Sequence, residues 1–315
     1  MLRRELLAGG LAIVATSPAW AKGASAPEWT PAQFHAARRF VELDVGRIAY
    51  VERGAGPAAV FLHGYPLNGF QWRGAMARLE GHRRCIAIDL MGLGYSDVAA
   101  DADLSPAAQA AMVVAVMDRL GLKAADLVSN DSATGVAQLV AAGHPGRVRS
   151  LLLTNGDVDA NSPPAPFMGA IEAARNDQLV GWFDKQLADN TFVRSHDGIG
   201  RGYSHPDRVL TQAVVDTYLR PLTGPDKRRR QGQGYAIAML PNPLPAAAPA
   251  LRRFDRPVRM VWARNNELFG DEWAAWLDRT FPKSRGVRFV EDANLFFPEE
   301  RPDLIAEEAR KLWGV

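Results

Sequence analysis

Residues 127–135 read LVSNDSATG and continue directly into VAQLVAAGHP at 136–145. A short apolar strand, a tight turn of small residues and an apolar helix follow one another without a break, an arrangement that can raise a nucleophile at the tip of a turn. Asp131 stands at the tip when Ser129 and Ala133 are its small flanking residues. A rival register places the Ser132 hydroxyl there. A structural alternative makes Asp131 only the cap of the helix, since Asp is a favourable N-cap residue.

Strand patterns and helix patterns alternate on both sides of this turn. Such alternation predicts an α/β fold with a mostly parallel sheet and helices on both faces. The expected helices are 105–120, 132–143, 271–281 and 303–313, the first capped by Ser105 with Pro106 at its first position. The expected strands are 47–54, 58–62, 85–90, 126–128 with its neighbours, 150–154, 258–263 and 287–291.

The alternation stops between about residue 157 and residue 250, where mixed polar helical patterns replace it. We therefore expect a core of residues 22–156 and 246–315, interrupted by a lid insertion at 157–245. Open α/β sheets bind ligands at the carboxyl ends of their strands, so the lid is expected to cover that edge. The proline-rich PNPLPAAAPA at 241–250 resembles a return linker, and the basic run at 228–230 suits a solvated face or lid ion pairs.

Composition excludes several classes of protein. The 315 residues are 47% hydrophobic and 23% charged, which is typical of a globular chain. Thirty-seven basic against 35 acidic residues give a formal charge of +2, too small an excess to predict a nucleic-acid partner. The single cysteine, Cys85, excludes an intrachain disulfide and a cysteine-rich metal site. No His, Cys and carboxylate spacing suits a metal, so neither a metal nor a cofactor is expected.

The amino terminus, residues 1–21, has the pattern of an export signal. Two arginines precede an apolar run at 6–15, and Ala19-Trp20-Ala21 suits a signal peptidase. The run is too short to span a bilayer, so no stable membrane insertion is expected after cleavage. Arg3-Arg4 loosely resembles a twin-arginine signal, with an ordinary secretory signal as the alternative. The prediction is export, to the periplasm or out of the cell.

Three motifs make the chain, from about residue 45 onward, resemble the α/β-hydrolase fold superfamily. They are the turn at 127–135, HGYPLNGFQWR at 63–73 and DLMGLGYSD at 89–97. The resemblance is nearest to the haloalkane dehalogenases, fluoroacetate dehalogenases and epoxide hydrolases, whose nucleophile position corresponds to Asp131. It implies a pocket beneath the lid for a small organic molecule.

The same resemblance assigns roles to residues of the 63–73 motif. The backbone N–H groups of Tyr65 and Ser132 would point at a developing negative charge. Asn68 and Trp72 lie where relatives place substrate-side or loop-fixing residues. Trp72 could donate its indole N–H to a leaving group or, equally, pack against the lid. His63 is expected to be structural.

Two positions depart from the superfamily pattern. The segment EDANLFFPEERP at 291–302 has Leu295 where the catalytic histidine is expected, and no histidine follows His205. Asn266 stands at the place of the acid that orients this histidine. A second acid site used by some dehalogenases falls near Asn155. Candidate substitutes for the missing groups are His196, His205, Asp157 and Glu267.

Three hypotheses follow from the absence of the expected catalytic histidine and acid. The first, which we favour, is a hydrolase that cleaves a carbon–halogen, epoxide or ester bond through Asp131 with a displaced base. The second is a lyase or isomerase in which Asp131 acts as a general acid or base, so that no ester has to be hydrolysed. The third is a binding protein that has kept the pocket and lost turnover. The sequence alone leaves the bond and the oligomeric state open.

Overall fold

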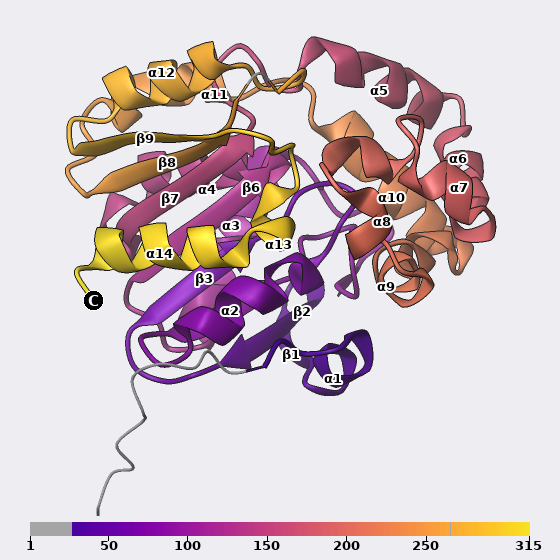
Figure 1. Ribbon diagram of the computed structural model, residues 1–315, viewed down its shortest axis with the longest axis horizontal. Coiled ribbons are helices and arrows are strands. Elements are labelled where there is room, and N and C mark those ends of the chain that lie inside the picture. The colour runs from indigo at the N-terminus through magenta and orange to yellow at the C-terminus, as the bar shows by residue number, and fades with distance from the viewer. Residues whose placement is uncertain (1–26, 265) are drawn as a thin grey trace, which may run out of the picture.

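The computed structural model describes residues 27–264 and 266–315. Within them the strands form one nine-stranded sheet in the order β1-β2-β4-β3-β6-β7-β8-β9, with β5 paired to β2 (Figure 1). Pairings that involve β1 and β2 are antiparallel, and the pairings from β4 through β9 are parallel. The strands are β1 (Arg39–Leu43), β2 (Gly46–Arg53), β3 (Ala58–Leu62), β4 (Arg84–Ile88), β5 (Asp97–Val98), β6 (Ala125–Asp131), β7 (Val148–Gly156), β8 (Val258–Ala263) and β9 (Ser284–Val290).

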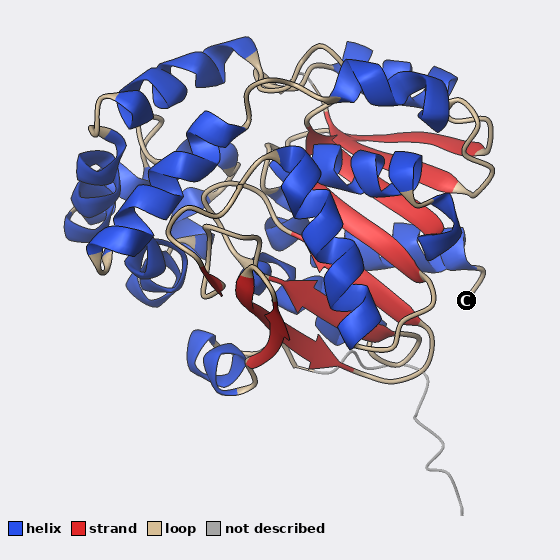
Figure 2. Ribbon diagram, turned by 180° about the vertical axis from the view of Figure 1, so that it is seen from behind, coloured by secondary structure: helices blue, strands red, loops and turns tan. Residues whose placement is uncertain are grey.

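Helices cover both faces of the sheet, as the views from opposite sides show (Figures 1 and 2). Helices α3, α4 and α11 pack together, and α4 lies on β6 and β7. Helices α2 and α14 pack together, with α14 on β7 and β8, while α12 packs on β8 and β9. The helices of this layered core are α1 (Pro31–Ala36), α2 (Arg73–Leu79), α3 (Pro106–Arg119), α4 (Ser132–Gly143), α11 (Leu244–Leu251), α12 (Asp271–Thr280), α13 (Phe297–Glu300) and α14 (Pro302–Trp313).

The central strands are buried along their length, which explains their sequence. Every residue of β3 and of β6 is buried. Strands covered on both faces need apolar side chains at successive positions, so β3 shows a short apolar run in place of alternation, whereas β6 combines the apolar pair Leu127-Val128 with buried polar side chains. The predicted helix at 132–143 and the predicted strand at 258–263 have these bounds in the structure. The expected α/β class with a mostly parallel sheet is confirmed.

A helical insertion separates β7 from β8 and lies beside the sheet, at the right in Figure 1. We call this insertion the lid. It contains the 3-10 turns η3 (Ala165–Phe167) and η4 (Ile199–Gly202) and the helices α5 (Met168–Arg175), α6 (Leu179–Ala188), α7 (Asn190–Arg194), α8 (Pro206–Val209), α9 (Gln212–Thr223) and α10 (Asp226–Ala238).

Two sequence expectations for this region have clear outcomes. The proline-rich tract at 241–250 was expected to be a linker, and this is wrong, because most of it forms α11, which packs on α4. Proline is tolerated in the first turn of a helix, where the N–H it lacks has no intrahelical partner, and Pro245 lies there. The basic run makes an ion pair within the lid, between Arg229 and Asp184 at 3.0 Å. Arg228 joins the lid to the core, because it donates to the backbone oxygens of Gly94 and Ser96.

The predicted signal segment 1–21 lies outside the described residues. Within the residues that are described, no helix is long and apolar enough to span a membrane.

Candidate active site

Asp131 lies at the junction of β6 and α4, in a strained backbone conformation. Its φ of 56° and ψ of −133° are rare for a residue with a side chain, and such strain persists only where surrounding packing imposes it. A Cβ atom at Gly64 would lie 2.4 Å from the Asp131 Cβ, and one at Gly156 would lie 2.1 Å from the Asp131 backbone oxygen. Glycine at these two positions therefore lets the chain close around the turn.

The Asp131 carboxylate accepts hydrogen bonds from backbone N–H groups and forms no ion pair among the described residues. Its Oδ2 accepts a hydrogen bond from the Tyr65 N–H at 2.8 Å, and the Ser132 N–H is a second donor. Burial raises the pKa of Asp131 to about 7, although these two N–H groups, which stabilise the charged form, act to lower it. The side chain makes no helix-capping hydrogen bond. The structure therefore does not support the alternative in which Asp131 serves only as a helix cap.

The neighbouring Ser132 has a different environment. Its hydroxyl lies 2.9 Å from the Tyr235 hydroxyl, inside the protein. Ser132 is not among the residues that line the cavity described below, whereas Asp131 is. The hydroxyl of Ser132 thus has a polar partner in the lid, and its N–H faces the carboxylate.

The residues of the 63–73 motif hold the loop that carries Tyr65. Asn68 accepts from the Phe70 N–H and donates to the backbone oxygen of Thr217 in α9, at 2.7 Å, which joins the loop to the lid. His63 Nε2 accepts from the Leu90 N–H, so this ring has a structural partner.

Trp72 is fully buried, with its ring 5.6 Å from the Phe61 ring between centroids. Neither Trp72 nor Asn68 lines the cavity. A leaving group in the cavity would therefore need another donor.

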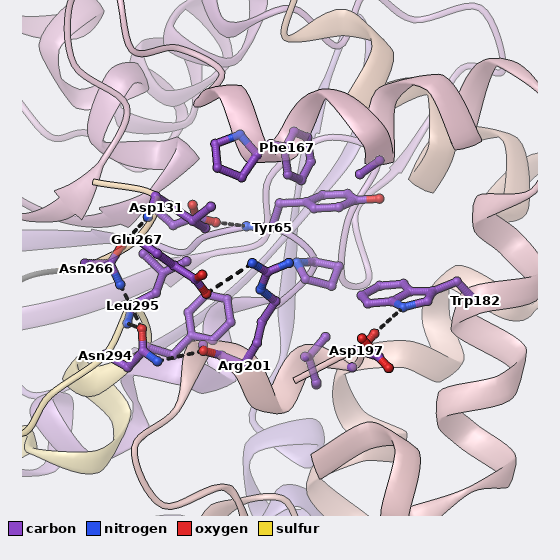
Figure 3. A pocket seen from close by; sticks show the side chains of 18 of the residues that line it. Tyr65, Asp131, Phe167, Trp182, Asp197, Arg201, Asn266, Glu267, Asn294 and Leu295 are labelled. Carbon is purple, nitrogen blue, oxygen red and sulfur yellow. Dashed lines mark hydrogen bonds and ion pairs between the residues drawn. The ribbon is translucent and has the colours of Figure 1, made fainter. Parts of the chain in front are cut away.

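A cavity of about 290 Å³ lies between the lid and the carboxyl ends of β3, β6, β8 and β9 (Figure 3). Asp131 is at one end, and lid side chains form an apolar wall. Polar side chains also line it, from the lid and from the loops after β8 and β9. The apolar lining includes Phe167, Ala170, Ala173, Leu179, Ile199 and Phe296, and the polar lining includes Asp197, Arg201, Asn266, Glu267 and Asn294.

Leu295 lines the same cavity from the loop after β9. The amide of Asn130, the residue before Asp131, donates to the Leu295 backbone oxygen at 2.9 Å and to the Thr154 hydroxyl at 2.8 Å. Gln71 in turn donates to the Asn130 side-chain oxygen at 2.7 Å. The Leu295 loop is thereby fixed beside the nucleophile turn. At this position the chain presents an isobutyl group that can neither accept nor donate a proton.

Amides occupy both positions considered for the acid. Asn266 accepts from the N–H groups of Leu268 and Phe269 and donates to the Asn294 side chain at 2.7 Å. Asn155 donates to the backbone oxygen of Ala263 and accepts from its N–H, joining β7 to β8. Both side chains hold backbone segments, and neither carries a charge.

Of the four candidate substitutes, Glu267 alone lines the cavity. His196 is largely exposed and lies 3.4 Å from Glu267, while His205 lines a separate surface pocket. Asp157 is buried outside the cavity. Its own burial, and secondarily the nearby Asp131 carboxylate, raise the pKa of Asp157 well above its usual range. Because Asp157 does not line the cavity, it is not placed to activate a water molecule there.

Arg201 was not anticipated from the sequence. It comes from η4 of the lid and donates to Glu267 at 3.1 Å. Figure 3 shows its guanidinium group extending into the cavity on the side of Asp131 and Tyr65. No motif surrounds Arg201 in the sequence. Its place at the cavity depends on how the lid folds over the core, which the local sequence does not indicate.

Comparison with known proteins identifies the family to which this fold belongs. The family model for the alpha/beta hydrolase fold matches residues 57–300, which is more than half of the chain. The chain belongs to the alpha/beta hydrolase fold family. Within the part of this alpha/beta hydrolase that the structure describes, no group of three or more His, Cys, Asp or Glu side chains is placed to hold a metal ion.

Curated relatives match this alpha/beta hydrolase over most of its length. A cis-3-alkyl-4-alkyloxetan-2-one decarboxylase from Xanthomonas campestris pv. campestris is 26% identical over 84% of this chain and 91% of its own. Haloalkane dehalogenase 2 from Mycobacterium tuberculosis is 27% identical over 88% of this chain and 94% of its own. Members of the family such as this dehalogenase are hydrolases that act on small molecules.

Solved structures support the fold alone, because their sequence identities are low. The epoxide hydrolase CorEH superposes with a TM-score of 0.74 at 22% identity, covering 88% of this chain and 98% of its own. The haloalkane dehalogenase DbeA from Bradyrhizobium elkani superposes with a TM-score of 0.71 at 23% identity, covering 88% and 97%.

Proposed function

We propose that this alpha/beta hydrolase attacks a small, largely apolar electrophile with the Asp131 carboxylate and forms an ester on that side chain. The observation that carries the proposal is the state of the carboxylate. Within the described residues its hydrogen bonds come from backbone N–H groups, no cation neutralises it, and it borders the cavity. A carboxylate that is poorly solvated and unpaired is a better nucleophile than a hydrated one.

The same backbone donors suit the ester that would form. Attack through one carboxylate oxygen leaves the other as an ester carbonyl oxygen. The N–H groups of Tyr65 and Ser132 would polarise this carbonyl group. Donors placed around the carboxylate itself favour Asp131 over Ser132 as the reacting residue.

The substrate class follows from the cavity and from the relatives. A cavity of about 290 Å³ with a largely apolar wall takes a small organic molecule. The relatives' names include a dehalogenase and a decarboxylase that acts on oxetan-2-ones. We therefore place alkyl halides, epoxides and strained lactones first among the candidate electrophiles.

The second half of a hydrolytic cycle has no evident base. Leu295 occupies the histidine position, and Glu267, the one candidate substitute at the cavity, is half exposed and paired with Arg201. We infer that an ester of Asp131 with an alkyl group hydrolyses slowly in this protein.

This lack of a base favours a second candidate function, a lyase. Decarboxylation of an oxetan-2-one consumes no water. Attack of Asp131 on the saturated ring carbon that bears the ring oxygen would break the bond between this carbon and the ring oxygen and release a carboxylate. Loss of CO₂ would then form a carbon–carbon double bond and expel Asp131 unchanged, so no base is required. The name of the Xanthomonas relative supports this alternative.

The test is intact mass spectrometry of the protein after incubation with alkyl halides, epoxides, activated esters and a four-membered lactone. We expect an alkyl adduct whose peptide map places it on Asp131, with Ser132→Ala giving the same adduct. Release of alkene and CO₂ from the lactone without an adduct would identify the lyase. Neither adduct nor product from any probe would contradict both functions and leave a binding protein.

A further inference from the structure

Arg201 is the one positively charged side chain among the described residues that line the cavity. It enters from the lid, whereas Asp131 enters from the end of a central strand, so the two side chains reach the cavity from different parts of the fold. The Arg201 backbone is held in place, because the Asn294 side chain donates to its oxygen at 2.7 Å and the Phe296 N–H donates to the next carbonyl oxygen, that of Gly202.

The donors of Arg201 are only partly used. A guanidinium group has five N–H donors, and the described contacts account for one, from Nη2 to Glu267. The Nε atom is buried and has no hydrogen-bond partner among residues 27–264 and 266–315. A buried charged donor without a partner is costly, so a bound group that accepts from it would be stabilised.

The proposed reaction supplies such a group. When the Asp131 oxygen bonds to carbon, the negative charge leaves the carboxylate and appears on the departing atom. A cation that lies beside the departing atom stabilises this charge. The tryptophan and asparagine of the 63–73 motif, Trp72 and Asn68, do not reach the cavity, so they do not supply this stabilisation.

We propose that Arg201 binds the anion that departs when Asp131 attacks. This inference rests on the proposed function. The bond between the Asp131 oxygen and carbon forms, the bond from carbon to the leaving group breaks, and the electron pair stays on the leaving group. The leaving group remains in the cavity as a halide, or as a carboxylate when a lactone ring opens, hydrogen-bonded to the guanidinium group. The step requires no proton and no further reactant.

The test compares the wild type with Arg201→Met, which removes the charge and retains an unbranched side chain. Both proteins react at pH 8 with 1-chlorobutane, 1-bromobutane and 1-iodobutane, and intact mass follows adduct formation at Asp131. Loss of a charged hydrogen bond should slow the chloride reaction about 10- to 100-fold. Iodide departs readily without help, so we expect its rate to fall less than about threefold. Equal changes for all three halides, or no change, would overturn the proposal, since a purely structural defect does not depend on the leaving group.

A matched control is Arg230→Met, which removes an exposed arginine of the same lid that does not line the cavity. Its rates with all three halides should equal those of the wild type. Arg201→Lys, which keeps the charge and loses the planar fork, should give intermediate chloride rates.

Bromide binding, measured by isothermal titration calorimetry, tests Arg201 without any reaction at Asp131. We expect saturable binding to the wild type, at least about tenfold weaker binding to Arg201→Met, and tighter binding to Glu267→Gln, which frees the guanidinium group from its ion pair. No saturable binding to the wild type, or equal affinity in the wild type and Arg201→Met, would overturn the proposal. If the wild type binds bromide in this way and forms no adduct, the proposed function fails while the assignment of Arg201 as the anion site stands.

Discussion

The turn after β6 and the loops after β8 and β9 line one cavity, and they differ in the chemistry of their side chains. The β6 turn has a strained Asp131, backbone donors to its carboxylate, and glycines where side chains would collide with it. The other two loops carry Asn266 and Leu295, which are neutral at the positions where an acid and a base are expected. We therefore propose a site that can attack a substrate through Asp131 and lacks a base for the activation of water.

The two loops show how neutral side chains can hold backbone segments beside the cavity. Asn266 still accepts from the N–H groups of Leu268 and Phe269, as a carboxylate would, so the loop after β8 keeps its shape. Asn130 binds the Leu295 backbone oxygen, a contact that does not depend on the side chain at 295. Both loops are therefore held in place without catalytic side chains, and the comparison can be tested by changing residues in each region.

The largest effect is expected in the β6 turn. Asp131→Asn removes the nucleophilic charge and keeps the shape, so adduct formation with 1-bromobutane should fall by at least about a thousandfold. Intact mass after timed incubation measures it. Ser132→Ala is the control and should leave the rate within about threefold of the wild type, because the Ser132 backbone N–H remains. A large loss in Ser132→Ala with little loss in Asp131→Asn would show that the serine is the reacting residue.

The next largest effect is expected in the loops after β8 and β9, which carry Asn266 and Leu295. Leu295→His combined with Asn266→Asp should supply a base and its orienting acid, and should speed hydrolysis of the Asp131 ester about 100- to 1,000-fold. The decay of the adduct mass, with ¹⁸O incorporation from labelled water, reports this step. Leu295→Gln combined with Asn266→Asp is the matched control, since glutamine is polar and not basic. Equal decay in the two double variants would mean that a histidine here does not reach the ester.

The pH profile examines the charge on Asp131. The carboxylate is the nucleophile, and burial raises the pKa of Asp131 to about 7. Below that pH the ionised fraction falls about tenfold per pH unit, so alkylation at pH 5 should be about 100-fold slower than its plateau above pH 8. Glu267→Gln should show the same profile. A rate that is constant from pH 5 to pH 8 would contradict a raised pKa at Asp131.

The smallest effect is on stability. Because the folded-state pKa of Asp131 is raised from 3.8 to about 7, the folded protein holds this proton where the unfolded chain has released it. Stability is therefore lost as pH rises from about 4 through about 7. Asp131→Asn should be more stable than the wild type at pH 8 by about 2 kcal/mol. The rise in the pKa of Asp131 limits this gain to about 4 kcal/mol. Urea unfolding at pH 5 and pH 8 measures the difference in the free energy of unfolding between Asp131→Asn and the wild type. This difference should grow with pH, and a difference that shrinks as pH rises would contradict the prediction.

Sequence patterns predicted the core better than the lid, for physical reasons. A buried parallel strand such as β3 needs an apolar run, and α4 follows a turn of small residues, so both elements can be predicted from the local sequence. Helix α11 was missed because its prolines resemble a linker, although packing on α4 supports it.

For the site as well, residues of the core were easier to predict from the sequence than residues of the lid. Asp131, Tyr65 and Leu295 belong to motifs of the core, and each lines the cavity. The substrate-side role considered for Trp72 depended on side-chain direction, and the structure buries this ring against Phe61. Arg201 lies in the lid, where no local pattern indicates which side chains face the cavity.

The lifetime of the alkylated wild-type protein tests the central claim most directly. The protein is alkylated to completion with 1-iodobutane at pH 8, freed of reagent, and followed by intact mass. If attack has been kept and water activation lost, the butyl ester on Asp131 should persist for many hours. An ester that forms and disappears within a minute, with ¹⁸O entering Asp131 from labelled water, would show that a working base exists and contradict the account.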